Sequence, residues 1–586
     1  MNKLLLTSSA LALVLAASSC KKDILDENPR SVLVPGFLGT PEGLQTGLAG
    51  VYSGLRNVLG DQGGSIFFTQ GTDEYMRGFA STDGYEDYAG TLTANNGTAS
   101  NFWATFYRYI NAANGVIQYA ATVQGVPAAT NAQTIAEAKV LRAYYYFMLV
   151  QSYGDVPLTL SFVDAPTKDV TRAPVADVYN AIVADLTDAL KTISPTAAQP
   201  GRVTRATALH LLSKVYLTRA TSATAKQASD YTNAALYATE LITDASTKYG
   251  RALESDPANI FREGNENGSE VLMNVQFSAD PTFTGISDNG AGGAGQNQTN
   301  YLFRGRYDLL PNMARSVIYG RPFGRLTSTP YLLNSYILPS ETTDRQWRTT
   351  DTRYAKWFST LWLVNSPGNN GGTAFNPKAV VGDTAAYYFG REISAAEQTR
   401  INNRANGRYI VGTPSTYTTN FSPYINKFDD ATRPAANTSS DRPVIVYRLA
   451  ETYLIAAEAN MYLGNLAKAT EYINVVRRRA AASGKTAQME ITPSQLNIDF
   501  ILDERTRELC GEFTRWPDLV RTGKLLERVK KYVPPLVTSK PSPIPGGTDT
   551  YGSNAAINIK DYHVLRPIPQ QEIDRTSGKI KQNPGY

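Results

Sequence analysis

Residues 503–521 read DERTRELCGEFTRWPDLVR, a stretch that combines closely spaced charges with bulky apolar side chains. In and beside it, apolar residues recur at intervals typical of one helix face, at Leu502, Leu509, Phe513, Trp516 and Val520. Pro517 disfavours helical backbone at the residue before it, so we expect a kink or a second helix start there. Asp503 and Arg507 are four residues apart and can pair on a helix surface. The stretch therefore predicts a packed helix whose arginine and carboxylate groups form a structural network.

A catalytic role for this stretch conflicts with its charge pattern and with the residue counts. Glu504, Glu508 or Glu512 would have to act as acid and base, but neighbouring arginines lower a carboxyl pKa, the wrong direction for a general acid. The two histidines and two cysteines are too few for a zinc site built from Cys and His. A Ser-His-Asp triad would need His210 or His563, and neither lies in a recognisable nucleophile motif. Hydrolysis by a carboxylate pair stays open, because 52 Asp and Glu residues offer many pairs.

The N-terminus has the three parts of a secretory signal. Lys3 gives a positive start, residues 4–17 are mostly apolar, and residues 17–19 are small. The apolar part is shorter than the roughly 20 residues that a membrane-spanning helix needs, which favours a cleaved signal. Cys20 directly after the small residues resembles the bacterial lipobox, in which the cysteine is acylated, although Ala17 stands where leucine is usual. We predict lipidation of Cys20 and anchoring to a membrane by several acyl chains; ordinary signal cleavage with a free Cys20 thiol is the alternative.

The overall composition is typical of a folded globular protein. The chain has 586 residues, 42% of them hydrophobic and 19% charged, which allows two or three domains or one large globule. Its formal net charge of +5 comes from Lys and Arg spread along the chain, which does not favour nucleic acid as a partner. If Cys20 is acylated, Cys510 has no cysteine left to pair with, and the core alone must hold the protein together.

Helical patterns dominate the chain. Residues 139–150 are apolar on all sides and predict a buried helix, and residues 206–220 and 231–242 read as an antiparallel helix pair. The clearest pair covers residues 447–480, with a break at residues 464–465 and small alanines at the contact positions. Alanine lets two helix axes approach closely, and the pattern resembles a tetratricopeptide repeat. We expect a mainly α fold with about four such hairpins and few short strands.

Two regions read as loops. Residues 280–440 hold long stretches rich in Gly, Asn, Thr and Pro, and loops of this length in a folded protein are often functional. Residues 533–551 contain five prolines, from which we expect no regular secondary structure. Between the helical regions, polar and apolar side chains alternate over much of residues 270–277, and this pattern predicts a short strand.

The stretch at 503–521 closely resembles the signature of the SusD/RagB family. Further segments in the same order are similar to other parts of that family, at residues 141–147, 154–158, 442–451, 567–573 and 582–586. The resemblance therefore extends over essentially the whole mature chain. It implies a signal peptide at 1–19, an N-terminal region with the first helical repeats at 20–230, and a C-terminal region with the loop-rich insert and last hairpin at 231–586, as one interleaved globule.

The resemblance also implies a function. Proteins of this kind are outer-membrane lipoproteins on the outside of Bacteroidetes cells, where they cap a SusC-like TonB-dependent transporter and hold glycan for import. They bind glycan without catalysing a reaction on it, so we expect no enzyme activity, no cofactor and no metal. The acidic loops also lack the EF-hand pattern of a calcium site. A binder of peptide cargo in the same transport system is one alternative, and a lipid-anchored glycan hydrolase is another.

A glycan site needs aromatic platforms and a few polar groups that fix hydroxyls. The chain has 35 tyrosines, whose flat rings suit either core packing or stacking on sugars. Two loop-like regions are candidates for ligand contact, and the predicted residues are Asp73, Tyr75, Arg77, Tyr85 and Tyr88 in the first, and Trp347, Trp357 and Trp362 in the second.

Overall fold

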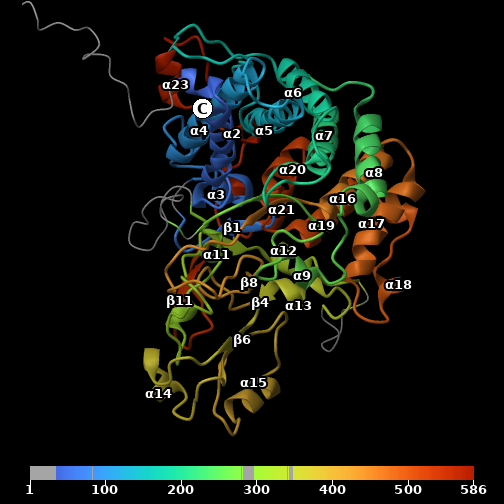
Figure 1. The fold of residues 1–586 in the computed structure, drawn as a ribbon. Helices are drawn as coiled ribbons and strands as arrows, with labels where there is room; N and C mark the ends of the chain where they lie inside the picture. Colours follow the sequence, from blue (N-terminus) through green and yellow to red (C-terminus); the bar gives the residue numbers. More distant parts are fainter. Residues whose placement is uncertain are drawn as a thin grey trace, which may run out of the picture.

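The computed structural model describes residues 35–81, 84–165, 167–278, 280, 296–339, 341 and 348–586. Long helices form one side of the molecule, and short helices, short strands and loops form the other (Figure 1). The predicted signal peptide and the predicted lipidation site, Cys20, lie outside these residues. Within them, no helix is both long enough and apolar enough to cross a membrane.

Seven long helices pack in succession as an array of antiparallel neighbours (Figure 1). They are α4 (Gly97–Ala120), α5 (Ala128–Tyr153), α6 (Val175–Ala189), α7 (Arg205–Ala220), α8 (Asp230–Lys248), α16 (Leu449–Tyr462) and α17 (Leu466–Ala480). The predicted mainly α fold with tetratricopeptide-like hairpins is confirmed. Helices α8 and α16 pack against each other although the whole loop-rich segment separates them in sequence, so that segment is an insertion into the array.

Local sequence explains how the array helices end and turn. Helix α5 is buried almost all round over its second half, as its apolar run predicts, and it ends at Gly154, whose φ of 73° suits glycine. Gly464 likewise has a φ of 80° at the turn between α16 and α17. Helix α16 begins at Leu449 rather than at residue 447, because Tyr447 belongs to a strand that pairs with a distant segment.

The remaining helices are shorter and lie before the array, in the insertion between α8 and α16, or after α17. The α-helices are α2 (Pro41–Ser53), α3 (Gln62–Thr69), α9 (Pro257–Ile260), α11 (Thr299–Leu302), α12 (Pro330–Asn334), α13 (Arg353–Trp357), α14 (Gly372–Phe375), α15 (Ala395–Asn402), α18 (Thr486–Met489), α19 (Ile498–Leu509), α20 (Arg515–Arg521), α21 (Leu525–Tyr532), α22 (Ala555–Asn558) and α23 (Gln570–Arg575). Short 3₁₀ helices are η2 (Pro35–Gly39), η3 (Gly54–Asn57), η4 (Tyr307–Leu309), η5 (Asn369–Gly371), η6 (Pro493–Gln495) and η7 (Asp561–Val564).

The strands form small separate sheets. Antiparallel pairs join β1 (Tyr75–Arg77) with β3 (Leu326–Ser328), β2 (Val271–Val275) with β9 (Val444–Arg448), β4 (Phe358–Ser359) with β8 (Tyr424–Ile425), and β10 (Val537–Pro541) with β11 (Thr548–Tyr551). A three-stranded sheet contains β5 (Leu361–Leu363), β6 (Thr384–Tyr388) and β7 (Ile410–Gly412), with β6 and β7 parallel. Strand β2 confirms the strand predicted at 270–277.

The expectation of no regular structure at 533–551 is wrong. The strands β10 and β11 form a two-stranded ribbon in this segment. Pro541 ends β10, and Pro543 and Pro545 fall in the turn, where they remove no ladder hydrogen bond. Both strands of such a ribbon are edge strands, which tolerate proline.

The signature stretch forms two helices, α19 and α20. Of the predicted kink or second helix start, the structure shows the second start, at Arg515, and α20 then continues through Trp516 and Pro517. Between them, Gly511 and Phe513 both have positive φ, at 78° and 62°, and reverse the chain. The predicted pairing of Asp503 with Arg507 is wrong. Arg507 pairs with Glu504 one turn away, and Asp503 faces Arg528 on α21.

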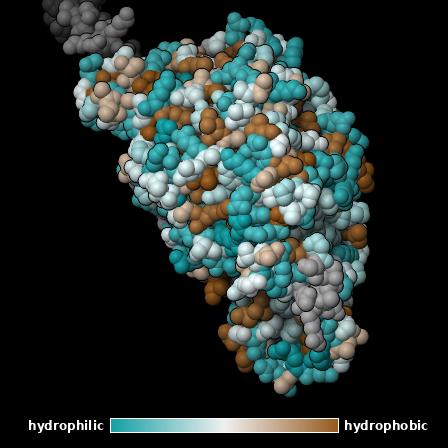
Figure 2. Space-filling model, turned by 90° about the vertical axis from the view of Figure 1, so that its right-hand side faces the viewer, coloured by the Kyte–Doolittle hydropathy of each residue, from teal (hydrophilic) through white to brown (hydrophobic). Residues whose placement is uncertain are grey.

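The core is continuous along the chain. One cluster of buried apolar side chains includes residues from Leu44 to Ile580 and so crosses the predicted boundary between residues 230 and 231. That boundary stays a prediction. Figure 2 shows the side of the molecule that carries the helical array, where hydrophilic and hydrophobic side chains are intermixed.

Candidate functional site

The charged groups of the signature stretch are buried and paired with one another and with distant segments. Glu508 accepts hydrogen bonds from the buried Arg353 (2.8 Å) and Arg448 (2.5 Å), and from Arg479, whose side chain is 5% exposed. Burial alone would raise the pKa of Glu508, but these three arginines hold it well below its ordinary value. Because a carboxylate so held does not donate a proton near neutral pH, the predicted structural network is confirmed.

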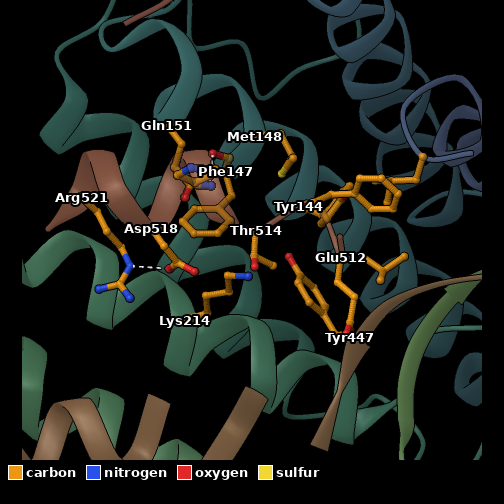
Figure 3. Close-up of a pocket in the computed structure, with 14 residues that line it drawn as sticks. Tyr144, Phe147, Met148, Gln151, Lys214, Tyr447, Glu512, Thr514, Asp518 and Arg521 are labelled. Carbon is orange, nitrogen blue, oxygen red and sulfur yellow. Dashed lines mark hydrogen bonds and ion pairs between the residues drawn. The ribbon is translucent and has the colours of Figure 1, made fainter. Parts of the chain in front are cut away.

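A hollow beside this network is too small for a sugar. Figure 3 shows it between α5, α7, β9 and α20, with Lys214 pointing toward Tyr447 and with Asp518 paired to Arg521. Its volume is about 30 Å³, which is enough for a water molecule or two. The hollow therefore belongs to the packing of the signature stretch.

The first predicted ligand region is mostly buried. Asp73 is fully buried and accepts bidentate hydrogen bonds from Arg515 (2.7 and 2.6 Å). Tyr85 donates to Asn96 and Tyr88 donates to the Gly71 carbonyl. These contacts give the three side chains a structural role.

Tyr75 and Arg77 differ although they belong to the same strand, β1. Tyr75 is fully buried against Phe303, with ring centroids 5.1 Å apart. Arg77 is the member of the first predicted set whose side chain reaches the surface. Ligand contact by any member of this set stays a prediction, and burial favours Arg77 over the others.

The second predicted region is buried where the structure describes it. Trp357 donates to the Pro257 carbonyl, and Lys427 Nζ lies 3.9 Å from its ring centroid. Trp362 is stacked between Tyr307 (4.8 Å between centroids) and Tyr424 (5.3 Å). Trp347 lies outside the described residues. Both described tryptophans are core side chains with at most 2% of their surface exposed.

Partly exposed aromatic and guanidinium groups gather beside β1 instead. We define the arginine–aromatic surface by these residues: Arg77, Phe79, Arg306, Tyr319, Arg321, Phe323 and Arg325. All of them are partly exposed. In Figure 1, β1 and α11 mark this region, to the left of the array helices α8 and α17.

The β1–β3 ladder brings two distant segments of this surface together. Beyond the ladder, Gly78 N donates to the Arg325 carbonyl and Ala80 N donates to the Gly324 carbonyl, both at 3.0 Å. Ser81 Oγ also donates to the Arg325 carbonyl (2.5 Å). The backbone of residues 78–81 is thereby fixed against that of residues 324–325.

Guanidinium groups lie over the aromatic rings of this surface. Arg306 is 5.6 Å from the Phe79 centroid, while Arg321 and Arg325 are 4.3 and 4.9 Å from the Phe323 centroid. Stacking of this kind holds a planar guanidinium group in place. Arg306 also donates to Asp308, and Arg325 donates to the Ala80 carbonyl. The surface therefore combines partly exposed aromatic rings with guanidinium groups fixed beside them, and both kinds of group occur in sugar-binding sites.

Glu74, just below this surface, gives a testable pH dependence. Burial raises its pKa from 4.5 to about 7, and its 3.3 Å contact with Arg515 does not offset this because Arg515 is already paired with Asp73. An acid whose pKa is raised in the folded state favours folding below its unfolded pKa and loses that contribution as pH rises from 4.5 to 7.

We therefore expect Glu74→Gln to gain stability relative to the wild type as pH rises through that window, reaching about 3 kcal/mol above pH 7. Urea unfolding of both proteins at several pH values between 4 and 8.5 measures the difference, in which all other titrating groups cancel. A difference that is constant with pH would show that the pKa of Glu74 is the same in the folded and unfolded states, and would contradict the raised pKa.

Fold and surface together define a helical-repeat protein with a loop-rich insertion that carries most of the arginine–aromatic surface. The model of the SusD family matches residues 269–586, and a second family model, described as "Starch-binding associating with outer membrane", matches residues 23–217. The chain belongs to the SusD family.

Curated and solved proteins resemble the chain over nearly its full length. SusD-like protein P25 of Formosa agariphila is 25% identical over 578 residues, which cover 96% of this chain and 95% of that protein. A solved laminarin-binding SusD-like protein is 23% identical with a TM-score of 0.65, covering 93% of this chain and 100% of the other. Surface glycan-binding protein A of Bacteroides thetaiotaomicron, solved with laminarihexaose, is 22% identical with a TM-score of 0.63 and covers 93% and 99%. These structural likenesses show the fold.

Sequence reasoning missed most of the exposed aromatic residues. Phe79, Tyr319 and Phe323 are not among the predicted contacts: no phenylalanine was predicted, and no local pattern sets Tyr319 apart from the other tyrosines. A signal was present: Phe79 follows Gly78, and Phe323 precedes Gly324. An added Cβ at Gly324 would lie 3.1 Å from the Phe79 ring, so the glycine permits the close approach of the two segments.

Proposed function

We propose that this chain is a lipoprotein on the cell surface that binds an oligosaccharide and passes it to a SusC-like TonB-dependent transporter. In this proposal Cys20 carries the acyl chains that hold the protein on the outer membrane, and the arginine–aromatic surface binds the glycan. The helical array is the candidate contact for the transporter, because repeat surfaces offer extended complementary area.

The observation that carries the proposal is the exposure of Phe79 and Phe323 beside fixed guanidinium groups. Sugar rings have apolar faces that stack on aromatic rings, and hydroxyl groups that pair with fixed donors. The relatives support the same class of ligand: one solved relative is a laminarin-binding protein and another holds laminarihexaose. The match to the family described as starch-binding and associating with the outer membrane supports both the ligand class and the location.

We expect Phe79→Ala and Phe323→Ala each to weaken oligosaccharide binding by at least tenfold, while the melting temperature changes by no more than a few degrees. Both rings are partly exposed, so their removal leaves little cavity. Calorimetric titration of the chain that starts at Lys21, against a panel of plant, algal and host oligosaccharides, measures the binding. Leu236→Ala on α8 is the matched control, because Leu236 is exposed on the helical array.

Further experiments test the two alternatives as well as transporter delivery and the lipid anchor. Titration with peptides in place of sugars tests for peptide cargo, and the appearance of new reducing ends in incubated glycans would reveal a hydrolase. Co-purification with an outer-membrane transporter tests delivery. Cys20→Ala should release the protein from the membrane fraction if Cys20 is the lipid anchor.

A further inference from the structure

We propose that the arginine–aromatic surface selects an anionic oligosaccharide, one whose sugars carry carboxylate or sulfate groups. This inference rests on the proposed function and narrows it from glycans in general to charged ones. The inference that the ligand is anionic is drawn from the numbers of positive and negative side chains around Phe79 and Phe323.

Among the residues that the structure describes, one edge of this surface has two arginines to a single carboxylate. Arg306 and Arg315 share one carboxylate, that of Asp308, at 2.8 and 3.1 Å. Asp308 can neutralise one of the two guanidinium groups, which leaves a net positive charge at this edge of the surface. Arg315 is itself 41% exposed and extends the positive region to the solvent.

Two further arginines have no carboxylate partner among the residues that the structure describes. Arg77 and Arg321 are both partly exposed, and neither forms an ion pair within that part of the chain. Arg321 lies 4.3 Å from the Phe323 centroid and 5.3 Å from the Tyr301 centroid, so two rings fix its position. A guanidinium group held in this way is prepared for bidentate pairing with a carboxylate or sulfate.

The contrast with the rest of the protein strengthens this point. Several buried arginines elsewhere are matched by carboxylates: Arg353 with Asp351, Glu504 and Glu508, and Arg448 with Glu270, Glu508 and Glu512. Arg566 is a different case, because it is buried against Trp516 and donates to the Phe67 carbonyl. Uncompensated arginines at a surface that also carries aromatic platforms favour a ligand that supplies the missing negative charge.

The test is a titration with oligosaccharide pairs that differ only in charge. Hexagalacturonate and its methyl ester form a carboxylate pair, and a sulfated carrageenan oligosaccharide and its desulfated form make a sulfate pair. Laminarihexaose and other neutral oligosaccharides complete the set. We expect an anionic member to bind at least tenfold more tightly than its neutral counterpart, with an affinity that falls several-fold between 50 and 500 mM NaCl.

Variants assign the effect to this surface. Arg321→Gln and Arg77→Gln should each weaken binding of the anionic member by about five- to tenfold and reduce its salt dependence. Arg400→Gln, at an exposed arginine on α15, should change neither the affinity for the anionic member nor its salt dependence. If Arg321→Gln and Arg77→Gln leave anionic binding unaltered, this surface does not select the charge and the inference fails.

The outcomes separate the inference from the proposed function. Tight, salt-independent binding of neutral oligosaccharides with no preference for the charged members would overturn the anionic inference and leave glycan binding standing. A failure of every oligosaccharide, charged or neutral, to bind would overturn the proposed function and the inference together. Preference within the carboxylate pair or within the sulfate pair identifies which anion the arginines recognise.

Discussion

Replacing Glu508 by glutamine is expected to lower the free energy of unfolding by about 3–5 kcal/mol. Glu508 is fully buried and is the shared acceptor for Arg353, Arg448 and Arg479. The amide keeps the size of the side chain but removes the negative charge, so three buried guanidinium groups lose part of their compensation. Urea denaturation with linear extrapolation, followed by circular dichroism, measures the loss.

Glu471→Gln is the matched control for this prediction. Glu471 also accepts two hydrogen bonds from an arginine, Arg478, at 2.8 and 2.7 Å, but both partners are solvent-exposed. Exposed ion pairs contribute less than about 1 kcal/mol, so we expect Glu471→Gln to lower the free energy of unfolding by less than that amount. Equal losses in the two variants would contradict the explanation that burial makes Glu508 important.

Local patterns were enough to predict the helices and the hairpin pairs α7–α8 and α16–α17, but not the contacts between segments far apart in sequence. The apolar run of α5 and the glycine turn between α16 and α17 depend on residues close in sequence, and both features are as predicted. The packing of α8 on α16 depends on a long-range contact across the insertion, and no local pattern encodes it. The same is true of Tyr447, whose strand partner is Met273.

The candidate site was harder to predict because exposure is set by partners far away in sequence. Trp357 is covered by Lys427, and Asp73 is covered by Arg515 and Arg528. From sequence alone each looked like a loop residue with a side chain suited to sugar. Only Arg77 of the first predicted set reaches the surface, because the strand that carries it ends there.

The second large effect is expected at Trp362, which the sequence suggested as a ligand platform. Trp362→Ala should lower the free energy of unfolding by about 3–5 kcal/mol, the usual cost of removing a buried tryptophan. The indole lies between Tyr307 and Tyr424, and Tyr319 packs against it with centroids 5.0 Å apart. Its removal leaves a cavity that these three rings cannot all close.

Leu363→Ala tests whether this cost comes from burial of the indole or from disruption of β5 itself. Leu363 follows Trp362 in the same strand, but its side chain points to the opposite face and is 38% exposed. We expect its replacement to cost less than about 1 kcal/mol, since surface substitutions rarely cost more. If instead Trp362→Ala abolished oligosaccharide binding with little change in the free energy of unfolding, Trp362 would be a ligand platform as first predicted. A large loss of stability that Leu363→Ala does not share would identify Trp362 as the core of the aromatic stack that supports Tyr319 at the surface.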